Sequence, residues 1–276
     1  MGANPGGQPG QTGGQVLVRY GVWVPNFGSF ADARLVADLA ARTEAAGWDG
    51  WFLWDHVVHL AGEEPVVDPW MALAAAALAT SRITLGTLVT PVPRRRPWNL
   101  ARQVATLDQM SGGRAVLGVG IGSVRTAEFS GYDEETDQVR RAAMLDEGLE
   151  LMAELWSGET VHHKGEHYRV DGVRFRPVPE QDPLPVWVGA VWPHRRPLRR
   201  AARWQGVFPE RLPGPEAVAQ IRQELGPGKD IVVSSRENHP ARDWAAAGAT
   251  WWVLSLRAGD AISDVEAAID AGPPRD

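Results

Sequence analysis

The feature that most constrains the fold is a repeated alternation of short apolar segments with amphipathic stretches. After the first apolar segment, Leu35, Val36, Leu39 and Ala40 recur at helical spacing. This alternation is typical of βα units around a parallel sheet. Eight strand candidates are found at 16–24, 51–54, 83–90, 114–120, 185–190, 206–208, 231–235 and 250–256. Eight helix candidates are found at 30–46, 68–81, 97–111, 138–157, 195–204, 214–225, 240–247 and 261–270.

These counts predict a (β/α)8 TIM barrel, forming a single domain over residues 16–276. Residues 158–182 interrupt the alternation and predict an extended excursion between helix 4 and strand 5. An open, doubly wound sheet is the competing fold, because a sequence does not exclude a topological switch point. Residues 1–15 are rich in Gly, Pro and Gln and lack the apolar core of a signal peptide, so a disordered leader is predicted.

The amino-acid composition limits the classes of molecule that this chain is expected to bind. The net charge is −6 with a pI near 5.7, which argues against nucleic acid or an anionic membrane as a partner. The chain contains no cysteine, which excludes disulfides and thiolate metal sites and is compatible with a cytoplasmic protein. No apolar run is long enough to span a membrane. Thirteen tryptophans suggest that flat surfaces line part of the molecule, and several of them belong to the core.

Asp55 and His56 directly follow the second predicted strand. In a barrel this is the functional face, where an imidazole can donate a hydrogen bond or proton to a reacting group. Alternatively, Asp55 caps the next turn and His56 is a structural histidine. Asp55, His56 and His59 are also metal-ligand types, which keeps a metal-dependent barrel hydrolase as an alternative. No metal site is predicted, because the other histidines lie in excursions or at helix starts.

Two further strand ends carry small residues. Gly120 and Gly122 follow strand 4 and permit close approach of a flat ring or phosphate, although tight strand–helix packing explains them equally well. They do not form a dinucleotide fingerprint. Strand 5 ends in small residues and leads into a basic helix start that can bind phosphate or simply face solvent. The residues concerned are Gly189, Ala190, Val191, Arg195 and Arg196.

Several segments together resemble the luciferase-like flavin and deazaflavin oxidoreductases, which include bacterial luciferase and enzymes that use coenzyme F420. The resemblance covers residues 19–274 and is carried by "YGVWVPNFG", "GWDGWFLWDH", "GEHYRV" and above all the segment 80–122. It implies a (β/α)8 barrel with a flavin-type ring held at the carboxyl-terminal mouth. It also implies an oxidoreductase or monooxygenase, since nothing in the sequence decides whether oxygen is a co-substrate.

The resemblance assigns roles to the candidate residues. His56 is expected to donate a proton or hydrogen bond near the reactive centre, and Asp55 to bond the ring or orient His56. A cis peptide at Thr87–Leu88 or Leu88–Val89 is expected to prop the ring. The resemblance implies further cofactor contacts, which we expect at Thr87, Leu88, Val89, Thr90, Gly120, Gly122, Gly189, Ala190, Val191, Arg195 and Arg196. Trp23, Trp54 and Trp192 are candidate pocket walls.

Departures from family patterns favour coenzyme F420 over FMN. The polar groups that bacterial luciferase carries near Ile121 and Val191 are absent, and Ser123 stands where sugar-phosphate dehydrogenases have an acid. The sequence therefore predicts an F420- or FMN-dependent oxidoreductase that transfers hydride to or from a small organic substrate. A homodimer is in keeping with the family. A flavin-binding protein without catalytic activity remains the other alternative.

Overall fold

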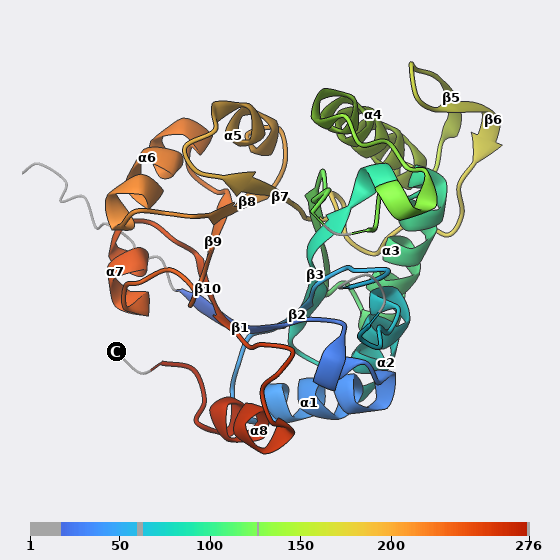
Figure 1. Cartoon of the computed structure of the whole chain (residues 1–276). Helices are drawn as coiled ribbons and strands as arrows, with labels where there is room; N and C mark the ends of the chain where they lie inside the picture. Colours follow the sequence, from blue (N-terminus) through green and yellow to red (C-terminus); the bar gives the residue numbers. More distant parts are fainter. Residues whose placement is uncertain (1–17, 60–62, 126, 275–276) are drawn as a thin grey trace, which may run out of the picture.

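The computed structural model describes residues 18–59, 63–125 and 127–274 and contains the predicted barrel. Its parallel strands close in the order β1-β10-β9-β8-β7-β4-β3-β2, which excludes the open sheet (Figure 1). The barrel strands are β1 (Arg19–Val24), β2 (Gly50–Leu53), β3 (Thr84–Pro91), β4 (Ala115–Gly120), β7 (Val186–Val191), β8 (Gly206–Glu210), β9 (Asp230–Ser234) and β10 (Trp251–Ser255). The predicted leader, residues 1–15, lies outside the described residues.

Helices surround the ring of strands in Figure 1. They are α1 (Ala33–Ala45), α2 (Pro69–Ala79), α3 (Pro97–Ser111), α4 (Gln138–Trp156), α5 (Arg195–Ala201), α6 (Pro215–Leu225), α7 (Ala241–Ala246) and α8 (Ile262–Asp270). Local signals set their ends. The Asp68 carboxylate accepts from the Met71 amide at 2.9 Å to cap α2, and Gly112, at φ 67°, ends α3 in the left-handed conformation.

The predicted excursion is a small antiparallel hairpin of β5 (Thr160–Lys164) and β6 (Arg169–Arg174). It forms a sheet of its own between α4 and β7, and Figure 1 shows it at the edge of the molecule beside α3 and α4. The hairpin therefore adds to the outside of the barrel without changing the closed strand order.

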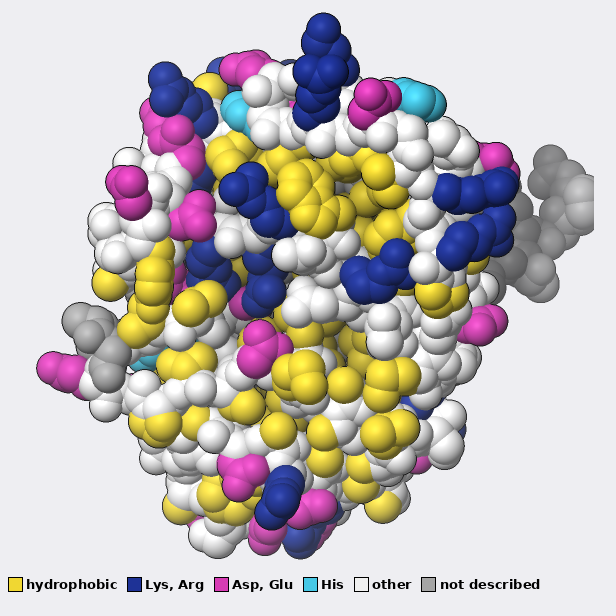
Figure 2. Space-filling model, turned by 90° about the vertical axis from the view of Figure 1, so that its right-hand side faces the viewer, with side chains coloured by type: hydrophobic (Ala, Val, Ile, Leu, Met, Phe, Trp, Pro, Cys, Tyr) yellow, Lys and Arg dark blue, Asp and Glu magenta, His cyan; other side chains and the backbone are white. Residues whose placement is uncertain are grey.

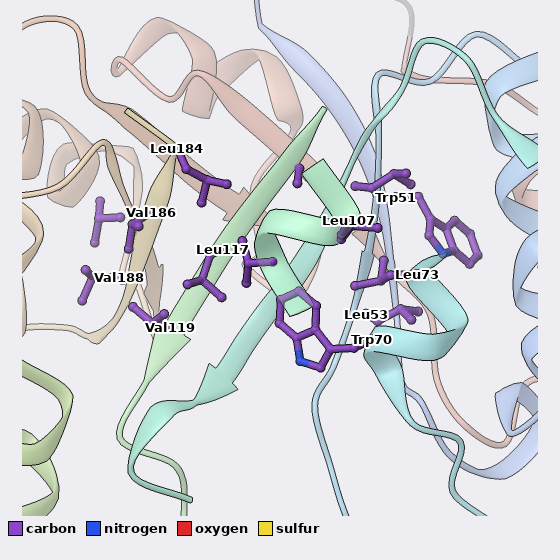
Figure 3. Packing of buried hydrophobic residues seen from close by; sticks show 14 of the residues in the cluster. Trp51, Leu53, Trp70, Leu73, Leu107, Leu117, Val119, Leu184, Val186 and Val188 are labelled. Carbon is purple, nitrogen blue, oxygen red and sulfur yellow. The ribbon is translucent and has the colours of Figure 1, made fainter. Parts of the chain in front are cut away.

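The period of two along each strand separates two apolar cores. One fills the space between strands and helices, where Figure 3 shows side chains of β4 and β7 together with those of α2 and α3. The other fills the barrel interior and consists of Trp23, Phe52, Leu88, Val116, Trp187, Phe208, Val232, Trp251 and Val253. In the "GWFLW" segment, Trp51 belongs to the outer core and Phe52 to the inner one.

Aromatic rings close the amino-terminal end of the barrel interior. Phe52, Trp187 and Trp251 lie with ring centroids 5.5–5.6 Å apart and are almost fully buried. Gly50 leaves room for them, because a Cβ there would lie 2.7 Å from Phe52 and 2.8 Å from Trp251. These three rings form what we call the aromatic plug. Side chains of the inner core on the other side of the plug can contact a ligand only at the carboxyl-terminal mouth of the barrel.

Candidate functional site at the barrel mouth

Asp55, just beyond the end of β2, is buried and fully engaged by donors from the end of β3. Arg95 donates to both carboxylate oxygens at 2.7 and 3.0 Å, and Thr90 Oγ1 donates to Oδ2 at 2.8 Å. Arg94 Nη2 donates to Oδ1 and to the Asp55 carbonyl, each at 2.8 Å. The carboxylate is therefore held inside an ionic cluster behind the mouth surface.

His56 is paired with an acid from a distant part of the chain. Its Nδ1 lies 2.9 Å from Oε2 of Glu128, which follows β4 and is only 2% exposed. The other oxygen, Oε1, accepts from the Val57 amide at 2.7 Å and pairs with Arg94. Burial acts to raise the pKa of Glu128, but the hydrogen bond from His56, the charge of Arg94 and the Val57 amide together lower it to about 2.

Asn26, just beyond the end of β1, fixes the backbone of His56. Its side chain accepts from the His56 amide at 3.0 Å and donates to the His56 carbonyl at 2.8 Å. The ring of Phe27 meets the imidazole edge to face at 5.3 Å. His56 is thus held on three sides, while Nε2 has no hydrogen-bond partner among the described residues.

Strand β3 carries the irregularity expected from the family resemblance. The Leu88–Val89 peptide is cis, at one of the two expected positions, and the register with β4 shifts between Thr87 and Thr90. The Leu88 carbonyl accepts from Trp23 Nε1 at 2.8 Å. Thr87 and Thr90 are both buried, with Thr87 Oγ1 donating to the Gly118 carbonyl at 3.1 Å. The two hydroxyl groups therefore lie beside the Asp55 cluster, on its β3 side.

The small residues of β4 and β7 make room for neighbouring side chains. A Cβ on Gly120 would lie 2.9 Å from Val89, and one on Gly189 would lie 3.4 Å from it. Gly122, at φ 75°, faces Phe129, whose ring a Cβ would approach to 2.5 Å. Close packing therefore favours glycine at positions 120 and 122, and Val89 lies against both Gly120 and Gly189.

The predicted phosphate contacts lie apart from the Asp55 cluster. Arg195 forms an ion pair with Glu224 of α6 and lies over the ring of Trp192 at 5.7 Å. Arg196 is exposed at the start of α5. Ala190 is buried and Val191 partly buried at the end of β7. No contact in the described part of the chain joins either arginine to Asp55 or His56.

The opposite wall of the mouth carries a second charged group. The Arg236 guanidinium lies 4.8 Å from the ring centroid of Trp23 and 4.7 Å from that of Trp54, and Nε donates to Ser255 Oγ at 2.7 Å. Glu210, at the end of β8, is exposed to solvent, although neighbouring atoms partly desolvate its carboxyl group. Desolvation raises the pKa of Glu210, while the charge of Arg236 lowers it less strongly.

Sequence reasoning missed Glu128, Arg94 and Arg95 as members of the site. The arginine run after strand 3 was a usable signal, because charges at a strand end of a barrel face the mouth. Glu128 had no such signal, since it lies in an irregular loop. Among the described residues, no group of three or more acids and histidines is placed to hold a metal ion. His59 instead stacks on Phe27 at 3.7 Å and pairs with Glu64.

A groove lies elsewhere, on the outer face between α3 and β6. It has a volume of about 530 Å³ and is lined by residues that include Trp98, Arg102 and Phe175. Figure 2 shows that face, hollowed and rich in hydrophobic side chains. Its lining includes Asp171, which pairs with His162, but both of these side chains are largely exposed, whereas the carboxylate that pairs with His56 is buried. The chemistry therefore points to the mouth. No helix of the described residues is long and apolar enough to cross a membrane.

Comparison with known proteins places these features in context. A family model described as luciferase-like monooxygenase matches residues 7–225. The F420-dependent glucose-6-phosphate dehydrogenase of Nakamurella multipartita is 40% identical over 162 residues, and that of Mycobacterium avium is 38% identical over 169. The alignments cover 57% and 59% of this chain but 47% and 49% of the relatives. The chain thus spans about half the length of the curated relatives it matches.

Solved structures share the fold. An F420-dependent secondary alcohol dehydrogenase in complex with an F420-acetone adduct matches with a TM-score of 0.75 at 16% identity, covering 92% of this chain and 96% of that one. A monooxygenase from Streptomyces bottropensis matches with a TM-score of 0.66 at 28% identity, covering 79% and 70%.

Proposed function

The chain belongs to the luciferase-like monooxygenase family, and from this we propose that it is an oxidoreductase that uses coenzyme F420, with FMN as the second candidate. The reaction is hydride transfer to or from a small organic substrate at the barrel mouth. The observation that carries the proposal is the pairing of His56 with a buried carboxylate at a strand end, beside an aromatic floor. The F420-dependent relatives support the choice of cofactor.

The mouth suits a flat ring with polar edges. The floor of the mouth is the part of the inner core nearest the carboxyl-terminal end of the barrel. It is formed by Trp23, Leu88 and Phe208, with Trp54 and Val89 packed against it. Trp54 Nε1 is a buried donor without a partner among the described residues, and it is suited to a carbonyl on the edge of a ring. Sites of this kind combine apolar walls with a few oriented polar groups.

The bound deazaflavin or flavin would supply the hydride-carrying centre. His56 would hold or deliver a proton at Nε2, since Nδ1 is engaged by Glu128. Asp55 would act through Arg94, which binds both Asp55 and Glu128. This shared contact would keep the end of β2 in place. Arg196, Gly189, Ala190 and Val191 would line the cofactor tail, with Arg195 available if it leaves Glu224.

The test is titration of the purified protein with F420 and with FMN, followed by absorbance or fluorescence. We expect F420 to bind with a Kd below about 100 μM, which corresponds to roughly −5.5 kcal/mol. Binding of neither compound would overturn the proposal. Binding without turnover across a panel of alcohols, aldehydes and sugar phosphates would instead indicate a cofactor carrier, and metal-dependent activity would indicate the hydrolase.

We also propose that a second copy of the chain covers helix α2. This helix, "PWMALAAAALA", has no charged side chain on any face, and Met71 and Leu78 are 67% and 75% exposed. A helix that is apolar all round is normally buried. Figure 2 shows hydrophobic side chains over this side of the molecule. A symmetric contact would pack α2 against its counterpart and bury about 800 Å² on each subunit.

The proposed binding partners of the chain follow from its net charge. A net charge of −6 favours a small molecule over nucleic acid or an anionic membrane. We propose a cytoplasmic location, with which a chain without cysteine is compatible.

A further inference from the structure

Glu128 contacts the proposed catalytic histidine from a loop that the cofactor and substrate assignments do not use. It lies between β4 and α4, 72 residues after His56, and its carboxylate is nearly inaccessible to solvent. The groups that face it include the His56 ring and the Val57 amide from the β2 end, and Arg94 from the β3 end. Arg95 and Asp55 complete the charges of this cluster.

The protonation state of Glu128 determines which ring nitrogen of His56 is free. Arg94, the Val57 amide and His56 together keep the acid ionised at neutral pH. An ionised carboxylate only accepts hydrogen bonds, so Nδ1 of His56 must be the donor. Nε2 is then the nitrogen whose proton can change, and it is the nitrogen that lacks a protein partner among the described residues.

We propose that Glu128 is a positioning residue that fixes the Nδ1–H tautomer of His56 and so directs Nε2 to the reacting group. The inference rests on the proposed function, because it gives His56 a proton to deliver. Arg94 extends this arrangement, because it binds both Glu128 and Asp55. The carboxylate that sets the tautomer of His56 and the ion pairs that hold Asp55 therefore share one cation. A carboxylate behind a histidine serves the same purpose in many active sites.

The first test measures the native protein and uses one variant only to assign the signal. A two-bond ¹H–¹⁵N NMR spectrum of ¹⁵N-histidine-labelled protein, with His56 assigned from His56→Ala, reports the tautomer of the neutral ring. We expect His56 to be protonated at Nδ1 in most molecules. A neutral ring protonated mainly at Nε2 would overturn the inference, whatever the activity.

The second test uses Glu128→Gln, with Glu128→Asp as the variant that retains the charge. In Glu128→Gln we expect the Nε2–H tautomer to gain population and kcat to fall about tenfold or more, while the Kd for cofactor stays within about twofold. Glu128→Asp should recover part of kcat and of the native tautomer. Glu154→Gln is the matched control, because Glu154 pairs with His163 at the hairpin, away from the mouth.

The outcomes separate this inference from the proposed function. If the native protein binds neither F420 nor FMN, the proposed function fails. If it binds and turns over but Glu128→Gln does so equally well with an unchanged tautomer, only the role of Glu128 fails. If Glu128→Gln does not fold, Glu128→Asp and the native spectrum decide the matter.

Discussion

Arg94 binds Asp55 twice through a single nitrogen: Nη2 lies 2.8 Å from the carboxylate and 2.8 Å from the backbone carbonyl of that residue. This contact joins the end of β3 to the end of β2 and also reaches Glu128 through Nη1. The arginine thus places one positive charge between two buried acids, and Arg95 supplies a second positive charge at Asp55.

Replacement of Arg94 by leucine should destabilise the protein by about 3–5 kcal/mol, because it leaves buried carboxylates without their shared cation. Urea unfolding followed by circular dichroism measures the loss. Arg96→Leu is the control, since Arg96 is exposed in the same run and should change stability by less than about 0.5 kcal/mol. An Arg94→Leu protein as stable as the control would contradict the ionic cluster.

The ionised state of Glu128 should make stability depend on pH. Its folded pKa of about 2 lies below its ordinary value of 4.5, so the stabilisation is full above pH 4.5 and is lost as the pH falls toward 2. The difference in unfolding free energy between native protein and Glu128→Gln should be on the order of 2–3 kcal/mol at pH 6 and shrink steadily below pH 4.5. A difference that stays constant from pH 6 to pH 2.5 would refute the depressed pKa.

If His56 acts as proposed, His56→Ala should lower kcat about 100-fold, because it removes the group that would carry the proton, while cofactor binding changes little. Steady-state kinetics with the best substrate of the panel gives the number. His162→Ala serves as control, since His162 lies on β5 and pairs with the exposed Asp171. Full turnover by His56→Ala would remove this residue from the mechanism.

Leu78→Asp should convert the proposed dimer to a monomer, because it would place a charge in the apolar contact of α2. Light scattering coupled to size-exclusion chromatography reads the mass directly. Val139→Asp is the comparison, because Val139 is 66% exposed, close to the exposure of Leu78, but lies on α4. A native protein that runs as a monomer, or a Leu78→Asp protein that remains a dimer, would remove α2 as the interface.

Gly50→Ala tests the aromatic plug. The added methyl would meet Phe52 and Trp251 well inside contact distance, so a loss of about 1–3 kcal/mol is expected. Gly259→Ala should be nearly neutral, since a Cβ there meets nothing within 4 Å. Thermal unfolding of the two variants side by side makes the comparison, and equal melting temperatures would show that the plug can yield.

The strands and helices could be predicted from local patterns in the sequence. The apolar run before Asp55 is a buried strand, Asp68 begins a helix through its carboxylate, and Gly112 ends one in the left-handed conformation. Asp55 and His56 could be placed at a strand end for the same reason. The partner of His56 could not, because the contact with Glu128 depends on how two loops fold over adjacent strands. Likewise the sequence does not reveal that Thr90 and Arg95 occupy the Asp55 oxygens.

The position of the aromatic plug also bears on how ligands reach the barrel. Phe52, Trp187 and Trp251 pack together at its amino-terminal end, so the inner core is approached from the carboxyl-terminal end. Under the proposed function, cofactor and substrate would therefore use one common entrance, on the side of the barrel opposite these three rings.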